Sequence, residues 1–404
     1  MGVVSHNLAL LRRGQPPEDA RWLQAMTAGR QWWLDHFCEH YLDNYIRQGG
    51  SKVKVLVGGE GSGKTHLLRC VAAEAMARSY TVVFLDLREV TWRLSNIVEF
   101  YKAVAAGVDR EKLIRGLCKR VAGELGYTPE EYDGSGSIFN LLVEREGLPP
   151  NIAAKELRKA AVRAFSHSDL SLPFSTLAYT LVSARMGQEP RPTLEDACWK
   201  WLLGEKLEPA EKRSSRLYER LIKANARVWL YGLIRLLRLS GESGVVVIID
   251  NMEVMLERSP ETGRFLYPPT AAKDTHELIR QLIDDVEILE HFLLLLSGRR
   301  ELLTHEHRGF RSYEALWMRL RSGLAPAPQF NPWADVVDVD RHLEAAGGED
   351  LAKQVGERLR RWLEEVGTRR RFRPNIQLDT ASPLRRTVME TALMTEYDEG
   401  EVGE

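Results

Sequence analysis

The amino-acid sequence predicts an α/β fold built on a parallel sheet. Four short runs, residues 53–57, 81–87, 245–249 and 292–296, are rich in Val, Ile and Leu, and such runs form strands that are covered on both faces. Amphipathic segments separate the runs, as expected where helices connect parallel strands. The first run also leads directly into a glycine-rich loop and a helix-forming segment.

That loop matches the pattern G-x-x-x-x-G-K-[ST] of nucleoside-triphosphate phosphate loops. Its glycines allow the backbone NH groups to point at phosphate oxygens, and the following helix N-terminus adds a favourable dipole. We predict that Lys64 reaches the β- and γ-phosphates and that Thr65 binds Mg²⁺. The alternative is a glycine-rich turn without a ligand, which the Lys-Thr pair and both flanks disfavour. The predicted ATP-binding residues are Gly58, Gly59, Glu60, Gly61, Ser62, Gly63, Lys64, Thr65 and His66.

Composition and charge exclude several other classes of protein. The 404 residues are 44% hydrophobic and 28% charged, which suits two or three globular domains. No segment has the length of a membrane span and the N-terminus does not resemble a signal peptide, so we expect a cytoplasmic protein with no membrane partner. Four scattered cysteines favour neither a disulfide framework nor a zinc site. With a net charge of -1, the protein does not attract nucleic acid through its overall charge.

The sequence between the strands predicts additional helical parts. No convincing strand occurs between the second and third apolar runs, so a large helical insertion lies there. Two late helical stretches predict a C-terminal helical lid. The predicted division is an N-terminal helical segment 1–50, a first part of the P-loop domain 51–125, the insertion 126–239, a second part of the P-loop domain 240–330, the lid 331–395 and an acidic disordered tail 396–404.

The third and fourth strands end in residues suited to phosphoryl chemistry. Asp250 closes the third strand and is the predicted partner of Thr65 for Mg²⁺. Asn251 follows; its amide can orient water but cannot accept a proton. Glu253 is the next carboxylate, and its spacing fits a catalytic acid or the start of a solvated helix equally well. Ser297, at the tip of the fourth strand, is predicted to orient water or to sense the γ-phosphate.

Arginines follow in two places. Arg308 and Arg311 come after the fourth strand, and one of them could act as an arginine finger toward a neighbouring subunit, although a surface charge is the alternative for each. Arg385 and Arg386 begin a late helix and are candidates for a lid arginine that touches the nucleotide, or for a solvated pair. The run Arg369–Arg373 fits either contact with DNA phosphates or an exposed basic loop.

Several segments resemble one known family. Most specific are Trp201–Leu207 and Lys223–Arg227, and Glu60–Arg69, Val245–Glu253 and Arg308–Leu316 are also similar. They resemble the BREX-type ATP-binding proteins of bacterial phage-defence islands, the BrxD-like P-loop family. The resemblance implies an AAA+ ATPase module of the origin-recognition/Cdc6-like kind, encoded beside a large helicase, a DNA methyltransferase and other defence proteins.

The chain departs from this family at two places. Where the family carries Asp-Glu-x-Glu, residues 250–253 read Asp-Asn-Met-Glu, so only the second acid is matched, at Glu253. The Pro-Arg of the lid reads Pro383-Leu384-Arg385, which leaves either Arg385 or Arg386 as the sensor arginine. The first departure predicts slow or partner-stimulated hydrolysis.

The sequence thus predicts an ATP-binding, AAA+-like protein of phage defence, with ATP and Mg²⁺ as its ligands. Its nucleotide state would regulate or recruit a DNA-acting partner such as a helicase or another defence protein, and a homo-oligomer and a basic lid on DNA are further predictions. Two alternatives stay open. One is a non-hydrolysing, nucleotide-bound scaffold for a defence complex, and the other is a DNA-stimulated motor that requires a ring and an arginine finger.

Overall fold

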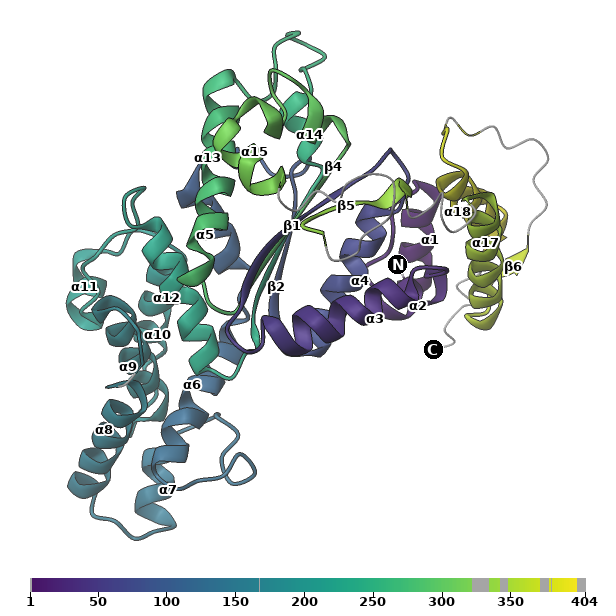
Figure 1. The fold of residues 1–404 in the computed structure, drawn as a ribbon. Helices are drawn as coiled ribbons and strands as arrows, with labels where there is room; N and C mark the ends of the chain where they lie inside the picture. Colours follow the sequence, from purple (N-terminus) through teal and green to yellow (C-terminus); the bar gives the residue numbers. More distant parts are fainter. Residues whose placement is uncertain are drawn as a thin grey trace.

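A five-stranded parallel sheet forms the centre of the protein (Figure 1). The computed structural model describes residues 2–166, 168–321, 334–341, 348–370, 378 and 380–397. The strand order is β2-β3-β4-β1-β5, and every neighbouring pair is parallel. The predicted α/β class with a parallel sheet is therefore confirmed. The strands are β1 (Ser51–Val57), β2 (Tyr80–Asp86), β3 (Gly244–Asp250), β4 (Phe292–Gly298) and β5 (Val336–Asp338).

The central strands are apolar throughout because both faces of the sheet are covered. All residues of β3 and β4 are buried. Along β3, Val245, Val247 and Ile249 join the core on one face, whereas Val246 and Ile248 join the core on the other. A continuous apolar run thus serves two cores with alternate residues, as expected for a doubly covered parallel sheet.

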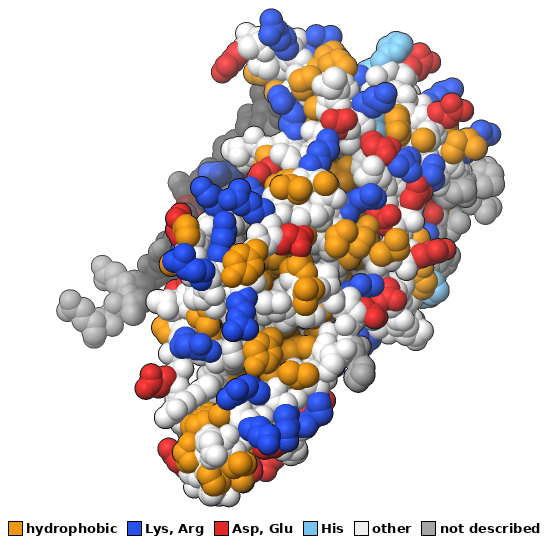
Figure 2. All heavy atoms as spheres, turned by 90° about the vertical axis from the view of Figure 1, so that its left-hand side faces the viewer, with side chains coloured by type: hydrophobic (Ala, Val, Ile, Leu, Met, Phe, Trp, Pro, Cys, Tyr) orange, Lys and Arg blue, Asp and Glu red, His pale blue; other side chains and the backbone are white. Residues whose placement is uncertain are grey.

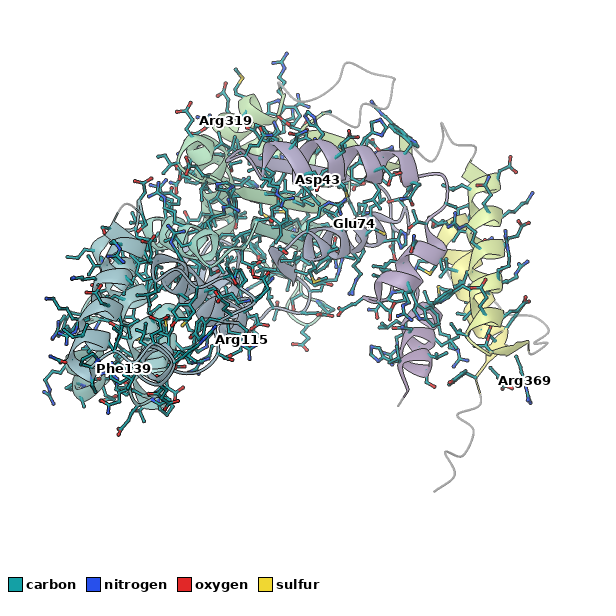
Figure 3. All side chains as sticks on the ribbon, turned by 90° about the horizontal axis from the view of Figure 1, so that it is seen from below. Asp43, Glu74, Arg115, Phe139, Arg319 and Arg369 are labelled. Carbon is teal, nitrogen blue, oxygen red and sulfur yellow. The ribbon has the colours of Figure 1, made fainter. Side chains whose placement is uncertain are left out.

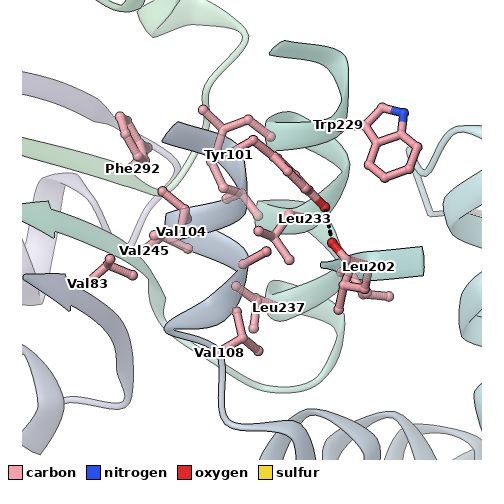
Figure 4. Packing of buried hydrophobic residues seen from close by; sticks show 14 of the residues in the cluster. Val83, Tyr101, Val104, Val108, Leu202, Trp229, Leu233, Leu237, Val245 and Phe292 are labelled. Carbon is pink, nitrogen blue, oxygen red and sulfur yellow. Dashed lines mark hydrogen bonds between the residues drawn. The ribbon is translucent and has the colours of Figure 1, made fainter. Parts of the chain in front are cut away.

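Different helices cover the two faces. One face packs on α3 (Gln31–Phe37), the π-helix η1 (Cys38–Tyr45) and α4 (Lys64–Ala77). On the other face lie α5 (Ile97–Ala106) and α12 (Ala226–Leu239). Figure 4 shows this second core, in which side chains of α5 and α12 meet those of the strands.

The remaining elements of the sheet domain follow β3 and β4. They are the 3-10 helices η2 (Met252–Leu256), η3 (Asp285–Glu287) and η4 (Phe310–Ser312), together with α13 (Pro269–Asp284), α14 (Glu301–Thr304) and α15 (Glu314–Arg321).

The chain between β2 and β3 contains the predicted helical insertion. It holds no strand among its described residues, and it extends away from the sheet at the lower left of Figure 1. Trp201 and Trp229 pack with ring centroids 4.1 Å apart, and the Tyr101 hydroxyl donates a 2.8 Å hydrogen bond to the Leu202 carbonyl (Figure 4). The insertion is therefore joined to α5 by a shared core. Its helices are α6 (Arg110–Glu124), α7 (Ile138–Glu144), α8 (Pro150–Ser166), α9 (Leu172–Met186), α10 (Pro192–Leu202) and α11 (Pro209–Ser215).

The lid packs against the N-terminal helices. It consists of α17 (Gly348–Glu365) and α18 (Pro383–Leu393), with β6 (Arg369–Arg370) pairing with β7 (Thr395–Glu396). A separate small core joins it to α1 (Val3–Arg12) and α2 (Ala20–Met26). The predicted helical lid is thus confirmed, and the N-terminal segment connects it to the sheet domain. Figure 3 shows Arg369 on the lid side and Phe139 on the opposite, insertion side.

Two other predictions concern the whole chain. None of the helices among the described residues is long and apolar enough to cross a membrane. The four cysteines are buried and free. The predicted domain boundaries stay predictions, and most of the predicted acidic tail lies outside the described residues.

Candidate functional site

The predicted phosphate loop lies between β1 and α4. Gly61 and Gly63 have left-handed backbones, with φ of 71° and 87°, a conformation that favours glycine. A Cβ atom at Gly61 would lie 2.6 Å from the Cβ of Ser382, so a larger residue would also collide with the lid. Glycine is therefore required where the loop turns and where the lid approaches it.

Lys64, the first residue of α4, closes the loop on itself. Its buried ammonium group donates hydrogen bonds to the carbonyl oxygens of Gly58, at 3.0 Å, and Gly59, at 2.7 Å. Burial lowers the pKa of Lys64, and the nearby carboxylates of Glu253 and Asp250 partly oppose this. An anionic phosphate would be a stronger acceptor for this ammonium group than the two neutral carbonyls, and it would favour the charged form.

Three polar side chains meet at the carboxyl ends of the strands. Thr65 Oγ1 donates a 2.6 Å hydrogen bond to Asp250 Oδ2, and Ser297 Oγ donates to Asp250 Oδ1. Because β4 lies between β1 and β3, its tip brings Ser297 beside Asp250, while Thr65 comes from the first turn of α4, directly after the loop. Asp250 and Ser297 are fully buried. The carboxylate is thus held by two hydroxyl donors.

This corner fits Mg²⁺ that is held together with a nucleotide. Hydroxyl and carboxylate oxygens are hard ligands, and Mg²⁺ usually takes its remaining ligands from substrate phosphates and water. The described residues include no group of three or more His, Cys, Asp or Glu side chains that could hold a metal ion. Thr65 and Asp250 would therefore hold Mg²⁺ only with the help of phosphate oxygens.

Asn251 turns the chain as β3 ends. Its backbone is left-handed, with φ 58° and ψ 39°, a conformation that Asn tolerates better than most residues. Its side-chain Nδ2 donates a 2.8 Å hydrogen bond to Asp86 Oδ1, at the end of β2. Asp86 and Asp250 are register partners. The amide that was predicted to orient water therefore also ties together the ends of two strands.

Glu253 is buried beside the loop and is held by arginines. Its Oε1 accepts a 3.2 Å hydrogen bond from Arg88 and lies 3.9 Å from Arg299 Nε, whereas its Oε2 has no hydrogen-bond partner among the described residues. Arg88, just after β2, also donates to Glu257, at 2.7 Å and 3.0 Å. Of the two alternatives that the sequence left for Glu253, a solvated position does not fit a residue that is 7% exposed.

The two finger candidates have different surroundings. The Arg308 guanidinium is buried, donates to the carbonyl oxygens of Tyr267 and Met255, and lies 3.6 Å from the centroid of the Phe265 ring. Burial lowers the pKa of Arg308. Arg311 is exposed. In this arrangement Arg308 is used within its own chain, so Arg311 is the better placed of the two to reach another subunit.

The two lid arginines also differ. Arg385 lines the cavity at the phosphate loop and pairs with Glu60 at 2.5 Å. Arg386 is exposed and donates to the Thr380 carbonyl, and it does not line this cavity. In addition, Ser382 Oγ donates a 2.8 Å hydrogen bond to the carbonyl oxygen of Gly61. The lid thus contacts the loop through Ser382 and Arg385.

A cavity of about 690 Å³ joins the loop, the N-terminal helices and the lid. Its apolar end is lined by Leu10, Leu11 and Met26 from the N-terminal helices and by residues of α17 and α18. Buried polar atoms without a partner are rare in native proteins and suggest a missing ligand or water. Among the described lining residues, five carry such atoms: Arg30 Nε, His66 Nδ1, Arg69 Nε, Glu253 Oε2 and Arg385 Nε.

Three residues at the loop escaped the sequence-based prediction. Arg30, 3% exposed, donates a 2.7 Å hydrogen bond to the Ser62 carbonyl, and burial lowers the pKa of its guanidinium to about 10. Asp340 Oδ2 accepts a 2.7 Å hydrogen bond from the Gly59 amide. Arg88 contacts Glu253, as described above. No local pattern marks any of these residues, because each reaches the site from a distant part of the chain.

His66 was predicted as a cofactor-binding residue, and it lies on the first turn of α4. Its Nε2 is 2.9 Å from Thr27 Oγ1, and burial lowers the pKa of His66 to about 3. The ring is therefore neutral at physiological pH and contributes no positive charge toward a phosphate. Its role in nucleotide binding stays a prediction, together with the roles of the other site residues.

The parallel sheet, with its glycine-rich loop and following helix, defines a protein of the P-loop NTPase-like class. Within this class, the chain belongs to the family of BREX system ATP-binding proteins BrxC/D, whose model matches residues 5–129 and 143–371. The resemblance inferred from the sequence is thereby confirmed, as is an ATP-binding role in a defence system that contains other proteins. Comparisons with curated proteins and with solved structures gave no match.

Proposed function

We propose that the protein binds Mg·ATP and uses slow or partner-stimulated hydrolysis as a switch. The observation that carries this proposal is the hydrogen-bonded group of Thr65, Asp250 and Ser297 beside Lys64. Loop amides and Lys64 would bind the phosphates, and Thr65 and Asp250 would hold the metal. Bound Mg²⁺ would neutralise charge on the β- and γ-phosphates.

Slow turnover is supported by the surroundings of the catalytic candidates. Glu253 is the carboxylate that could accept a proton from water, but Arg88 binds its Oε1. A carboxylate oxygen in a charge-assisted hydrogen bond is held by its donor, and that bond must break before the oxygen can turn toward a water. The Asn251 amide, in turn, is bonded to Asp86. Hydrolysis would then require a rearrangement at the ends of β2 and β3, which a partner could supply.

The lid contacts suggest how nucleotide state would be transmitted. Arg385 pairs with Glu60, and Glu60 also lies 3.4 Å from Arg299, which approaches Glu253. A γ-phosphate would compete with Glu60 for Arg385 and for Arg299. The lid position would then differ between ATP and ADP, and a DNA-acting partner such as a helicase, or another BREX protein, would respond to the difference. DNA contact by Arg369–Arg373 stays a prediction because residues 371–373 lie outside the described part.

Steady-state phosphate release with Mg·ATP, with and without duplex DNA or a BREX partner, tests this proposal. We expect weak basal release that a partner stimulates, and loss of release in Lys64→Ala, Asp250→Asn and Glu253→Gln. Arg93→Gln is a matched control near the site, because Arg93 bonds the Leu266 carbonyl and does not line the cavity. Release that persists in Glu253→Gln would remove Glu253 from the mechanism.

A non-hydrolysing scaffold is the second candidate, and Asn251 at the position after Asp250 favours it. This candidate predicts that nucleotide copurifies with the protein and that no phosphate is released under any of these conditions. A DNA-stimulated motor would additionally need a homo-oligomer and an arginine finger. For the motor, Arg311→Ala should abolish turnover without weakening ATP binding.

A further inference from the structure

The helical insertion carries a second surface with a chemistry of its own. It is formed by the segment from Arg213 to Val228, which links α11 to the start of α12 and runs without regular secondary structure from Arg216 to Ile222. We call its exposed cations and larger exposed hydrophobic side chains the insertion strip. They are Arg213, Arg216, Tyr218, Arg220, Ile222, Lys223 and Val228; Ser214, Glu219 and Ala224 of the same segment are also exposed.

The cations of the insertion strip have no acidic partners among the described residues. Within that part of the chain, Arg213, Arg216, Arg220 and Lys223 make no ion pair and no side-chain hydrogen bond. Glu219 is the single acid within this segment, and its Oε1 is used by Trp229 Nε1, at 2.9 Å, and by Asn225, at 2.8 Å. Glu219 offsets only one of the four cations, so the strip keeps a net positive charge although the whole chain has a net charge of -1.

The backbone beneath the strip is anchored. Ser215 and Leu217 are buried, and Trp201 Nε1 donates a 2.7 Å hydrogen bond to the Glu219 carbonyl. Arg216 adopts a left-handed conformation, with φ 60°, which costs roughly 1 kcal/mol for a residue with a Cβ atom. The surrounding contacts thus hold the backbone that carries the cations at an energetic cost, and binding would require little additional ordering of that backbone.

Hydrophobic side chains stand between these cations. Tyr218 is 64% exposed, Ile222 is 54% exposed and Val228 is 52% exposed. Figure 2 looks onto this side of the molecule and shows a band of Lys and Arg side chains interleaved with hydrophobic ones and few acids. Binding of single strands without sequence preference requires cations that contact the phosphates and an exposed aromatic ring on which a base can stack.

We propose that the insertion strip binds single-stranded nucleic acid, with its four cations on the sugar–phosphate backbone and Tyr218 stacked on an unpaired base. The strip is separate from the nucleotide cavity and lies at the opposite end of the molecule from the lid, where sequence reasoning placed DNA contact (Figures 1 and 3). This proposal goes beyond the ATP switch and does not depend on hydrolysis.

The test is fluorescence anisotropy of a labelled oligothymidylate with the full chain over a series of salt concentrations. Four neutralised phosphates predict a slope of log K against log salt of about -3, since each contributes about -0.7 on a single strand. Arg216→Gln/Arg220→Gln should make the slope shallower by about 1.4. Tyr218→Ala should weaken binding about 5-fold or more without changing the slope, because stacking is uncharged.

Arg47→Gln/Lys273→Gln is the matched control, since these two cations are exposed and lie outside the strip. It should leave both affinity and slope unchanged. ATP binding by every variant reports correct folding and separates a failure here from a failure of the proposed ATP switch. Three results would overturn the proposal. The first is no binding at low salt, and the second is binding that the strip variants do not weaken. The third is that duplex DNA or polyglutamate binds as tightly as the oligothymidylate and that Tyr218→Ala does not change this binding.

Discussion

Replacing Arg88 by Gln should raise basal phosphate release. Arg88 follows β2 and binds Glu253, the carboxylate proposed to accept a proton from the attacking water. While this bond exists, Glu253 Oε1 is held toward the Arg88 guanidinium. Removing the guanidinium frees the carboxylate, and the two bonds from Arg88 to Glu257, which do not involve catalysis, are lost with it.

The size of the effect follows from the burial of the pair. The Glu253 side chain is 9% exposed and the Arg88 side chain is 41% exposed, with 3.2 Å between Nη2 and Oε1. Exposed pairs contribute up to about 1 kcal/mol, and breaking a buried pair costs about 3 kcal/mol or more. For this half-buried pair we take an interaction energy of about 1 to 2 kcal/mol, between these two values. If hydrolysis must break the pair, Arg88→Gln lowers the activation barrier by that amount and raises the rate roughly 5- to 30-fold.

The assay is single-turnover phosphate release from Mg·ATP, with nucleotide affinity measured in parallel. Arg88→Lys retains a positive charge and should give a smaller increase, and Arg93→Gln should give none. The double variant Arg88→Gln/Glu253→Gln should release no phosphate, because the gain acts through Glu253. A slower rate in Arg88→Gln, or a gain that survives in the double variant, would refute the reasoning and make Arg88 a residue that supports catalysis.

Further predictions concern the lid, the metal site and pH. Arg385→Ala should weaken ATP binding roughly tenfold and ADP binding less, given about 1.5 kcal/mol for a charged hydrogen bond, whereas Arg386→Ala should change neither in titration calorimetry. Asp250→Asn should abolish the Mg²⁺ dependence of ATP affinity; a retained dependence contradicts the assigned ligand. His66 has a folded-state pKa of about 3, below its unfolded value of about 6.5, so stability is lost as pH falls through this range. His66→Gln should reduce the slope of unfolding free energy against pH by up to about 1.4 kcal/mol per pH unit, as measured by urea denaturation at several pH values. If this slope is the same in the variant, His66 is not a buried neutral ring.

Local patterns were sufficient where the chemistry is contiguous in the chain. The predicted phosphate loop is eight successive residues between a strand and a helix, so its glycines, Lys64 and Thr65 could be identified directly from the sequence. The four apolar runs likewise identified β1 to β4, because strands buried on both faces need apolar residues throughout. The three-residue strand β5 and the π-helix η1 were not predicted, since neither has a distinctive periodicity.

The amino-acid sequence by itself determined the fold class, the place of the glycine-rich loop between a strand and a helix, and the identity of Asp250 as the acid that ends a strand. Only the tertiary structure decided which residues surround these groups. Arg30 and Asp340 reach the loop across 32 and 281 positions of sequence, and Arg88 reaches Glu253 across 165. The same folding buries Arg308 and leaves Arg311 exposed. The physical reason is that helix and strand periodicity reflects short-range burial, whereas the order of parallel strands and the docking of a lid depend on packing between distant segments.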